Sequence, residues 1–119
     1  MKKRNIILIG MPGAGKSSVG VILAKALGYE FIDTDLVIQH REKRLLREII
    51  ADEGNEGFLA IENEVNATLE ADESVIAPGG SAIYGKEAME HFKEIGTIVY
   101  LKLSYEDLAK RLGNLKGRG

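Results

Sequence analysis

Short apolar runs alternate along the chain with longer segments in which apolar residues recur every three or four positions. Continuous apolar runs are typical of strands that are buried on both faces of a parallel sheet. A spacing of three and four instead indicates a helix that buries one face. The continuous run at residues 5–9 therefore predicts a buried strand, and shorter stretches predict further strands at 29–33, 74–78 and 97–103.

Helical spacing fills the segments between these runs. Gly28 stands where a C′ glycine would end a first helix, and Ser104 with Asp107 forms a capping box that would open a last one. The sequence therefore predicts helices at residues 16–27, 36–69 with a break at 54–57, 86–94 and from 104 onward.

The alternation of strands and helices indicates one α/β domain over residues 1–119. Successive strand–helix–strand units form a parallel sheet with right-handed crossovers and helices on both faces. We therefore expect a three-layer α/β/α architecture. Residues 114–119 are rich in glycine and contain no closing strand or helix, so the sheet is expected to be incomplete at its C-terminal end.

Composition excludes several classes of function. Cysteine is absent, which rules out disulfides, cysteine-type zinc sites and thiol nucleophiles. The 16 Lys and Arg residues nearly balance 18 Asp and Glu residues, for a formal charge of −2, which argues against a nucleic-acid partner. No apolar run approaches the roughly 20 residues of a membrane helix. We expect a cytoplasmic monomer without a membrane partner.

A phosphate-binding loop follows the first predicted strand. The octet Gly10-Met11-Pro12-Gly13-Ala14-Gly15-Lys16-Ser17 matches G-x-x-x-x-G-K-[ST] and leads into a helix. Backbone N–H groups of such a loop and the helix N-terminus bind phosphate, while a plain glycine-rich turn is the alternative. Lys16 would reach the β- and γ-phosphates and Ser17 would ligate Mg²⁺. The predicted nucleotide site covers residues 10–18 and so includes Ser18.

Together with this loop, three further features occur in a diagnostic order: Asp33-Thr34-Asp35, then Gly57-Phe58-x-x-x-Glu62, then Gly79-Gly80. With Arg118 they make the chain resemble the shikimate kinase family over essentially its whole length. The resemblance implies a P-loop kinase fold and transfer of the ATP γ-phosphate to the 3-hydroxyl of shikimate, with Mg²⁺ as the cofactor. It also implies substrate-binding helices at residues 36–70 and the start of a lid at 112–119.

The resemblance also assigns roles to single residues. Asp33 would hold Mg²⁺ through its water shell, and Asp35 would orient the attacking hydroxyl and accept its proton. A plain cap of the following helix is the alternative for both carboxylates. Arg118 would contact the transferred phosphate and Arg111 would stack on adenine, unless they are solvated surface arginines. The implied substrate-binding residues are Asp35, Phe58, Gly79, Gly80 and Ser81.

The chain departs from the family pattern at two positions. Leu59 stands where the family has an arginine that binds the substrate carboxylate, and Ser81 stands where it has a third glycine. Leucine cannot form a bidentate pair with a carboxylate, and Glu62, one helical turn on, loses its usual partner. A kinase for a gluconate-like metabolite or a nucleotide, or a nucleotide-binding module without transfer activity, therefore stays open.

One further pattern concerns the surface. The segment His40-Arg41-Glu42-Lys43-Arg44 is densely charged and falls within a predicted helix. We interpret it as a solvated helix face.

Overall fold

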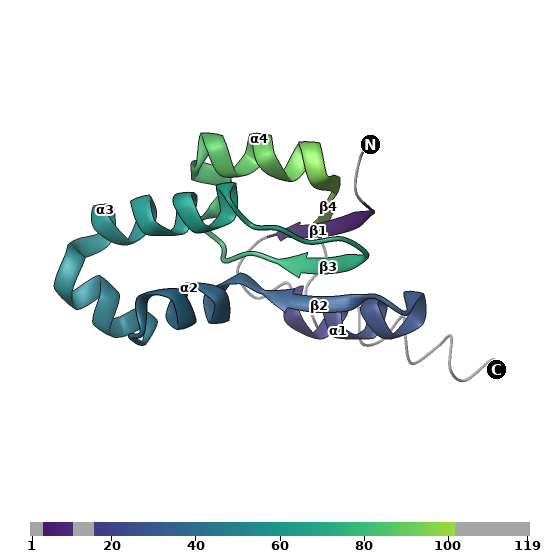
Figure 1. Cartoon of the computed structure of the whole chain (residues 1–119), viewed down its shortest axis with the longest axis horizontal. Helices are drawn as coiled ribbons and strands as arrows, with labels where there is room; N and C mark the ends of the chain where they lie inside the picture. Colours follow the sequence, from purple (N-terminus) through teal and green to yellow (C-terminus); the bar gives the residue numbers. More distant parts are fainter. Residues whose placement is uncertain (1–3, 11–15, 102–119) are drawn as a thin grey trace.

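The computed structural model of the protein describes residues 4–10 and 16–101. Strands and helices alternate through this part of the chain (Figure 1). In chain order they are β1 (Asn5–Gly10), α1 (Lys16–Leu27), β2 (Glu30–Asp33), α2 (Thr34–Glu42), α3 (Leu46–Ala67), β3 (Ser74–Ala77), the 3₁₀ helix η1 (Ala82–Tyr84), α4 (Lys86–Ile95) and β4 (Gly96–Leu101). Within those ranges, no helix is long and apolar enough to cross a membrane.

The strands form a parallel sheet, as the alternation predicts, and their order is β2-β3-β1-β4. Strand β3 ends at Ala77 because Pro78, which lacks an N–H, cannot continue the ladder. Helix α1 ends at Gly28, whose φ of 72° confirms the predicted C′ glycine. The helix predicted from residue 104 lies outside the described residues, and η1 was not predicted.

Two hydrophobic cores lie on opposite faces of the sheet. Alternate residues of β1 point in opposite directions, so that Ile7 and Ile9 pack toward α4 while Leu8 packs toward α1. On the α4 side, Phe92 is fully buried. Helix α1 thus covers one face and α4 the other, which gives the three layers expected from the sequence (Figure 1).

Helices α2 and α3 form an arm with a small core of its own. Ile38, Ile49 and Val65 are its buried residues. Gly54 has a φ of 74° and kinks α3, which confirms the predicted break at 54–57. The prediction of one continuous helix from 36 to that break is wrong, because α2 ends at Glu42, where Lys43 adopts the left-handed conformation with a φ of 55°. The arm extends from the end of β2 and returns to the sheet beside α4 (Figure 1).

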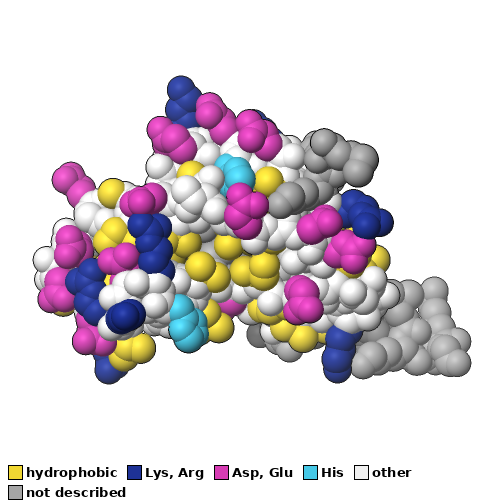
Figure 2. Space-filling model, viewed as in Figure 1, with side chains coloured by type: hydrophobic (Ala, Val, Ile, Leu, Met, Phe, Trp, Pro, Cys, Tyr) yellow, Lys and Arg dark blue, Asp and Glu magenta, His cyan; other side chains and the backbone are white. Residues whose placement is uncertain are grey.

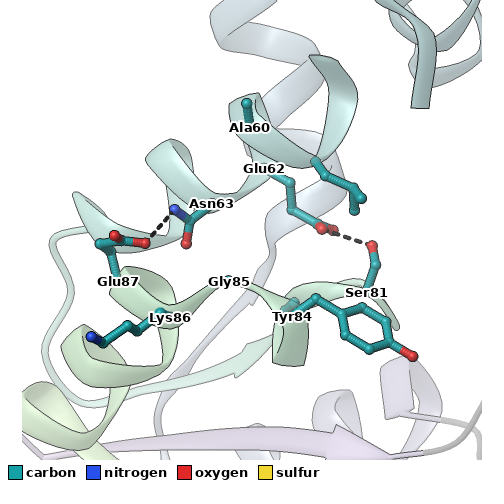
Figure 3. Close-up of a pocket in the computed structure, with 10 residues that line it drawn as sticks. Ala60, Glu62, Asn63, Ser81, Tyr84, Gly85, Lys86 and Glu87 are labelled. Atoms are coloured by element: carbon teal, nitrogen blue, oxygen red, sulfur yellow. Dashed lines mark hydrogen bonds between the residues drawn. The ribbon is translucent and has the colours of Figure 1, made fainter. Parts of the chain in front are cut away.

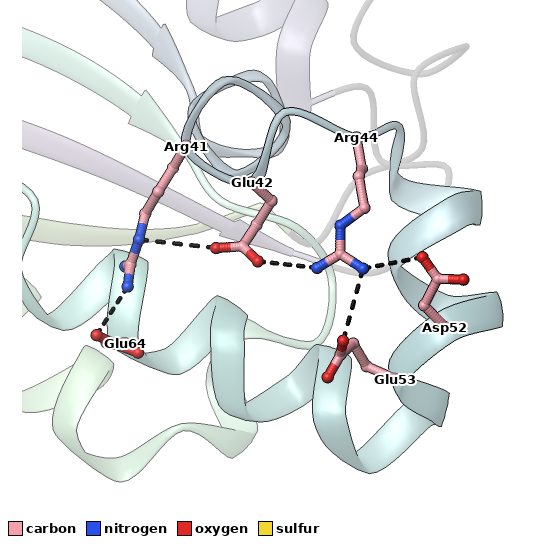
Figure 4. A network of polar contacts seen from close by, with 6 residues as sticks. All are labelled: Arg41, Glu42, Arg44, Asp52, Glu53 and Glu64. Atoms are coloured by element: carbon pink, nitrogen blue, oxygen red, sulfur yellow. Dashed lines mark hydrogen bonds and ion pairs between the residues drawn. The ribbon is translucent and has the colours of Figure 1, made fainter.

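The charged segment 40–44 does more than face solvent. Charged side chains gather over α2 and the first half of α3, at the left of the view (Figure 2). Arg44 pairs with Glu42 and with Asp52, both at 3.0 Å, and Arg41 pairs with Glu64 at 2.8 Å (Figure 4). The interpretation as a simple solvated face is therefore incomplete, because these pairs join α2 to both halves of the kinked α3.

Candidate active site

The carboxyl ends of the parallel strands bring the predicted site residues to one edge of the sheet. Strands β1, β2 and β3 end at Gly10, Asp33 and Ala77. In open α/β sheets, ligands bind at this edge. Of the predicted residues, Met11, Pro12, Gly13, Ala14, Gly15, Arg111 and Arg118 lie outside the described ranges.

The first turn of α1 presents the described part of the phosphate-binding loop. Lys16 is the first residue of α1, and its Nζ donates a hydrogen bond to the carbonyl oxygen of Gly10 at 3.1 Å. Ser17 and Ser18 are exposed in the same turn. The N-terminus of α1 carries a positive partial charge, so an anion that approaches these residues meets both the helix dipole and the Lys16 ammonium.

Asp33 and Asp35 mark the junction between β2 and α2. The Oδ1 atom of Asp33 accepts a hydrogen bond from the backbone N–H of Asp35 at 2.9 Å, so Asp33 is the N-cap of α2. Thr34 is fully buried, while Asp35 is half-buried in the first turn. The capping alternative therefore holds for Asp33, whose contribution to Mg²⁺ binding stays a prediction.

Two carboxylates converge on Gly79, which follows β3. A Cβ atom built on Gly79 would lie 2.9 Å from Glu62 Oε2 and 3.1 Å from Asp35 Oδ1. Partial burial raises the pKa of Asp35, the charge of Asp33 raises it further, and the Lys16 ammonium opposes both effects. Asp35 thus lies within electrostatic reach of Lys16 and beside the glycine turn.

Glu62 is the site residue for which the sequence did not identify a partner. Its side chain projects from α3 and is only 2% exposed. Burial raises the pKa of Glu62, and the neighbouring charge of Asp35 adds to this, whereas a hydrogen bond from Ser81 Oγ to Oε1 at 2.7 Å opposes it. Ser81 therefore contacts Glu62, although it was predicted only as a substrate-binding residue. No sequence spacing links positions 62 and 81, because the pair forms only after α3 folds back over the sheet.

A cavity of about 300 Å³ opens beside this pair (Figure 3). Leu59 is 38% exposed and lines the cavity with Glu62, Ser81 and Tyr84. Phe58, whose role in substrate binding stays a prediction, is half-buried and packs against the core of the α2–α3 arm. The structure thus brings together Asp35, Gly79 and Ser81 and leaves Phe58 half-buried in the arm.

The fold and this site define a class: a three-layer α/β protein with a phosphate-binding loop before its first helix, as in P-loop kinases. The shikimate kinase family model matches residues 12–119, so the chain belongs to the shikimate kinase family. Shikimate kinase 2 of Yersinia pseudotuberculosis is 38% identical over 109 residues, which cover 92% of this chain and 63% of that protein. The chain therefore spans less than two thirds of the length of this relative.

Solved structures agree with the family assignment. Shikimate kinase from Acinetobacter baumannii in complex with shikimate is 39% identical, with a TM-score of 0.77 over 83% of this chain and 56% of that one. A gluconokinase from Sinorhizobium meliloti is 27% identical, with a TM-score of 0.50 over 97% of this chain and 66% of that one. The similarity is thus greater to the shikimate kinase than to the sugar-acid kinase.

Proposed function

We propose that the protein transfers the γ-phosphate of ATP to the 3-hydroxyl of shikimate. One observation carries this proposal: the half-buried carboxylate of Asp35 faces the glycine turn at the sheet edge, within electrostatic reach of Lys16. A phosphotransferase needs such a carboxylate beside its phosphate-binding lysine, whereas a module that only binds nucleotide does not.

The residues at this edge would divide the reaction between them. Lys16 and the N-terminus of α1 would hold the β- and γ-phosphates and stabilise the charge that develops during transfer. Asp35 would accept a hydrogen bond from the acceptor hydroxyl, orient its oxygen toward the γ-phosphorus and take its proton. The raised pKa of Asp35 makes its carboxylate a stronger base than an exposed aspartate.

The donor set also fits Mg²⁺. Ser17 supplies an exposed hydroxyl at the start of α1, and Asp33 supplies a carboxylate at the end of β2. Mg²⁺ prefers oxygen ligands and keeps several waters, so one hydroxyl and one water-mediated carboxylate suffice when nucleotide phosphates provide the rest. When bound, the ion would neutralise charge on the β- and γ-phosphates.

A different acceptor is the second candidate, and Leu59 is the observation that favours it. The leucine side chain lines the cavity at the position where the family pattern has an arginine, and it offers no charge to a carboxylate. Shikimate remains our proposal because the similarity to the shikimate kinase of Acinetobacter baumannii exceeds that to the gluconokinase. Monomeric state and cytoplasmic location stay predictions.

An acceptor panel tests the proposed function. ADP release would be measured with MgATP and each of shikimate, quinate, gluconate and nucleoside monophosphates. We expect shikimate to give the highest kcat/KM, and Lys16→Ala to reduce it by a factor of about 100 to 1,000, typical of lost transition-state stabilisation. A higher kcat/KM with another compound would make that compound the proposed acceptor in place of shikimate. If no compound of the panel led to ADP release, the result would favour a nucleotide-binding module without transfer activity.

A further inference from the structure

The carboxylate of Glu62 is held in an unusual environment. It is 2% exposed, and within residues 4–10 and 16–101 it forms no ion pair. A buried carboxylate without a hydrogen bond is costly. The hydroxyl of Ser81 supplies that bond at 2.7 Å, from the turn between β3 and η1 (Figure 3).

The bond from Ser81 joins two walls of the cavity. Glu62 comes from α3 and Ser81 from the turn, 19 residues further along the chain. Because Ser81 holds Oε1, the second oxygen of Glu62 lies against Gly79, which Asp35 Oδ1 also approaches. The hydrogen bond therefore sets the distance between α3 and the glycine turn and keeps the Glu62 carboxylate from shifting within the space beside Asp35.

We propose that Ser81 is a positioning residue for the acceptor and acts through Glu62. Its hydroxyl fixes the Glu62 carboxylate, which in turn fixes the wall of the site that the acceptor must pass to reach Asp35. A glycine or alanine at position 81 has no donor for this purpose. This inference rests on the proposed function, because it assumes that the acceptor hydroxyl meets Asp35.

Kinetics of matched variants test the proposal. Ser81→Ala removes the donor, and Ser81→Thr keeps it. We expect Ser81→Ala to raise KM for shikimate about tenfold, in line with a hydrogen bond to a charged group, with KM for ATP within about twofold of wild type. Ser81→Thr should restore most of the loss. Equal acceptor KM in wild type and Ser81→Ala, or equal losses in the alanine and threonine variants, would overturn the proposal.

A double-mutant cycle tests the route through Glu62. Glu62→Met has a similar length but carries no oxygen acceptor, so Ser81→Ala should change the acceptor KM less than about twofold in that background. The same tenfold loss in both backgrounds would mean that Ser81 acts without Glu62.

A readout independent of turnover separates this proposal from the proposed function. The pKa of Glu62 can be followed by its carboxyl carbon-13 shift as the pH is varied. Ser81→Ala should raise this pKa, because the hydrogen bond that Ser81 donates in the wild type stabilises the ionised carboxylate. An unchanged titration would overturn the positioning role even in an active enzyme. A wild-type protein that phosphorylates no acceptor would overturn the proposed function, whatever the titration shows.

Discussion

Substitution of Gly79 by alanine places a methyl group between the two carboxylates of the site. The added Cβ would lie 2.9 Å from Glu62 Oε2 and 3.1 Å from Asp35 Oδ1, whereas ordinary contacts begin near 3.4 Å. One carboxylate must therefore retreat by about 0.5 Å and the other by about 0.3 Å, or the turn must move. Glu62 has little freedom to retreat, because it is buried and bonded to Ser81.

The size of the effect follows from these displacements. Overpacking costs about 1–3 kcal/mol of the free energy of unfolding, and we expect a cost of about 1 kcal/mol here, because the displaced atoms are side-chain ends and Glu62 lines a cavity. A misplacement of about 1 Å can reduce a reaction rate by about 100-fold. Because the shifts here are about a third to a half of that, we expect kcat/KM for the acceptor to fall roughly tenfold. The Kd for ATP should stay nearly constant.

Chemical denaturation and steady-state kinetics measure these two effects. Gly80→Ala is the matched control for stability, since a Cβ on Gly80 meets nothing within 4 Å. Its free energy of unfolding should stay within about 0.5 kcal/mol of wild type. Equal stability of the two alanine variants, or full acceptor turnover in Gly79→Ala, would refute the convergence of Asp35 and Glu62 on this glycine.

Three other substitutions test the packing, the titration and the acceptor. Gly20→Ala should lower the free energy of unfolding by about 1–3 kcal/mol, because the added Cβ would overlap Phe31 where α1 packs on β2. This loss should exceed the gain from the higher helix propensity of alanine, and an unchanged denaturation curve would contradict the packing. Glu62→Gln should raise the unfolding midpoint at neutral pH, because glutamine is uncharged and Glu62 has a raised pKa in the folded state. The wild type has its full stability below pH 4.5, the ordinary pKa of glutamate, and loses part of it as the pH rises through the folded-state pKa and Glu62 ionises. That advantage should vanish toward about pH 4, and a pH-independent difference would refute it. Leu59→Arg should lower KM for shikimate at least tenfold and leave KM for ATP almost unchanged. If the wild type already binds shikimate tightly and the variant binds it no better, another residue compensates for Leu59.

Local sequence patterns predict the elements well because each follows from a short-range rule. Short apolar segments identified the strands, of which β1 and β3 are central and largely buried while β2 and β4 are partly exposed edge strands, and Gly28 marked the end of α1. The start of α2 was less predictable. Asp33 caps this helix, so it begins at Thr34 rather than near Leu36. The same three residues satisfy both a capping pattern and an active-site pattern, and sequence alone does not separate them.

Contacts between distant segments account for what the sequence did not predict. The bond from Ser81 to Glu62 depends on how α3 returns to the sheet, and no residue spacing encodes it. The pair between Arg41 and Glu64 likewise joins α2 to the second half of α3 across the kink. Phe58 follows the family motif, but its burial in the arm depends on neighbours from both helices.

Transfer of a radiolabelled γ-phosphate from ATP to shikimate tests the central claim most directly, in wild type and in Asp35→Asn. Asparagine keeps the shape of Asp35 but cannot accept the hydroxyl proton, so kcat should collapse while the Kd for ATP stays nearly constant. The account predicts labelled shikimate phosphate from wild type and almost none from Asp35→Asn. Equal labelling by both proteins, or label that appears only as inorganic phosphate, would contradict it.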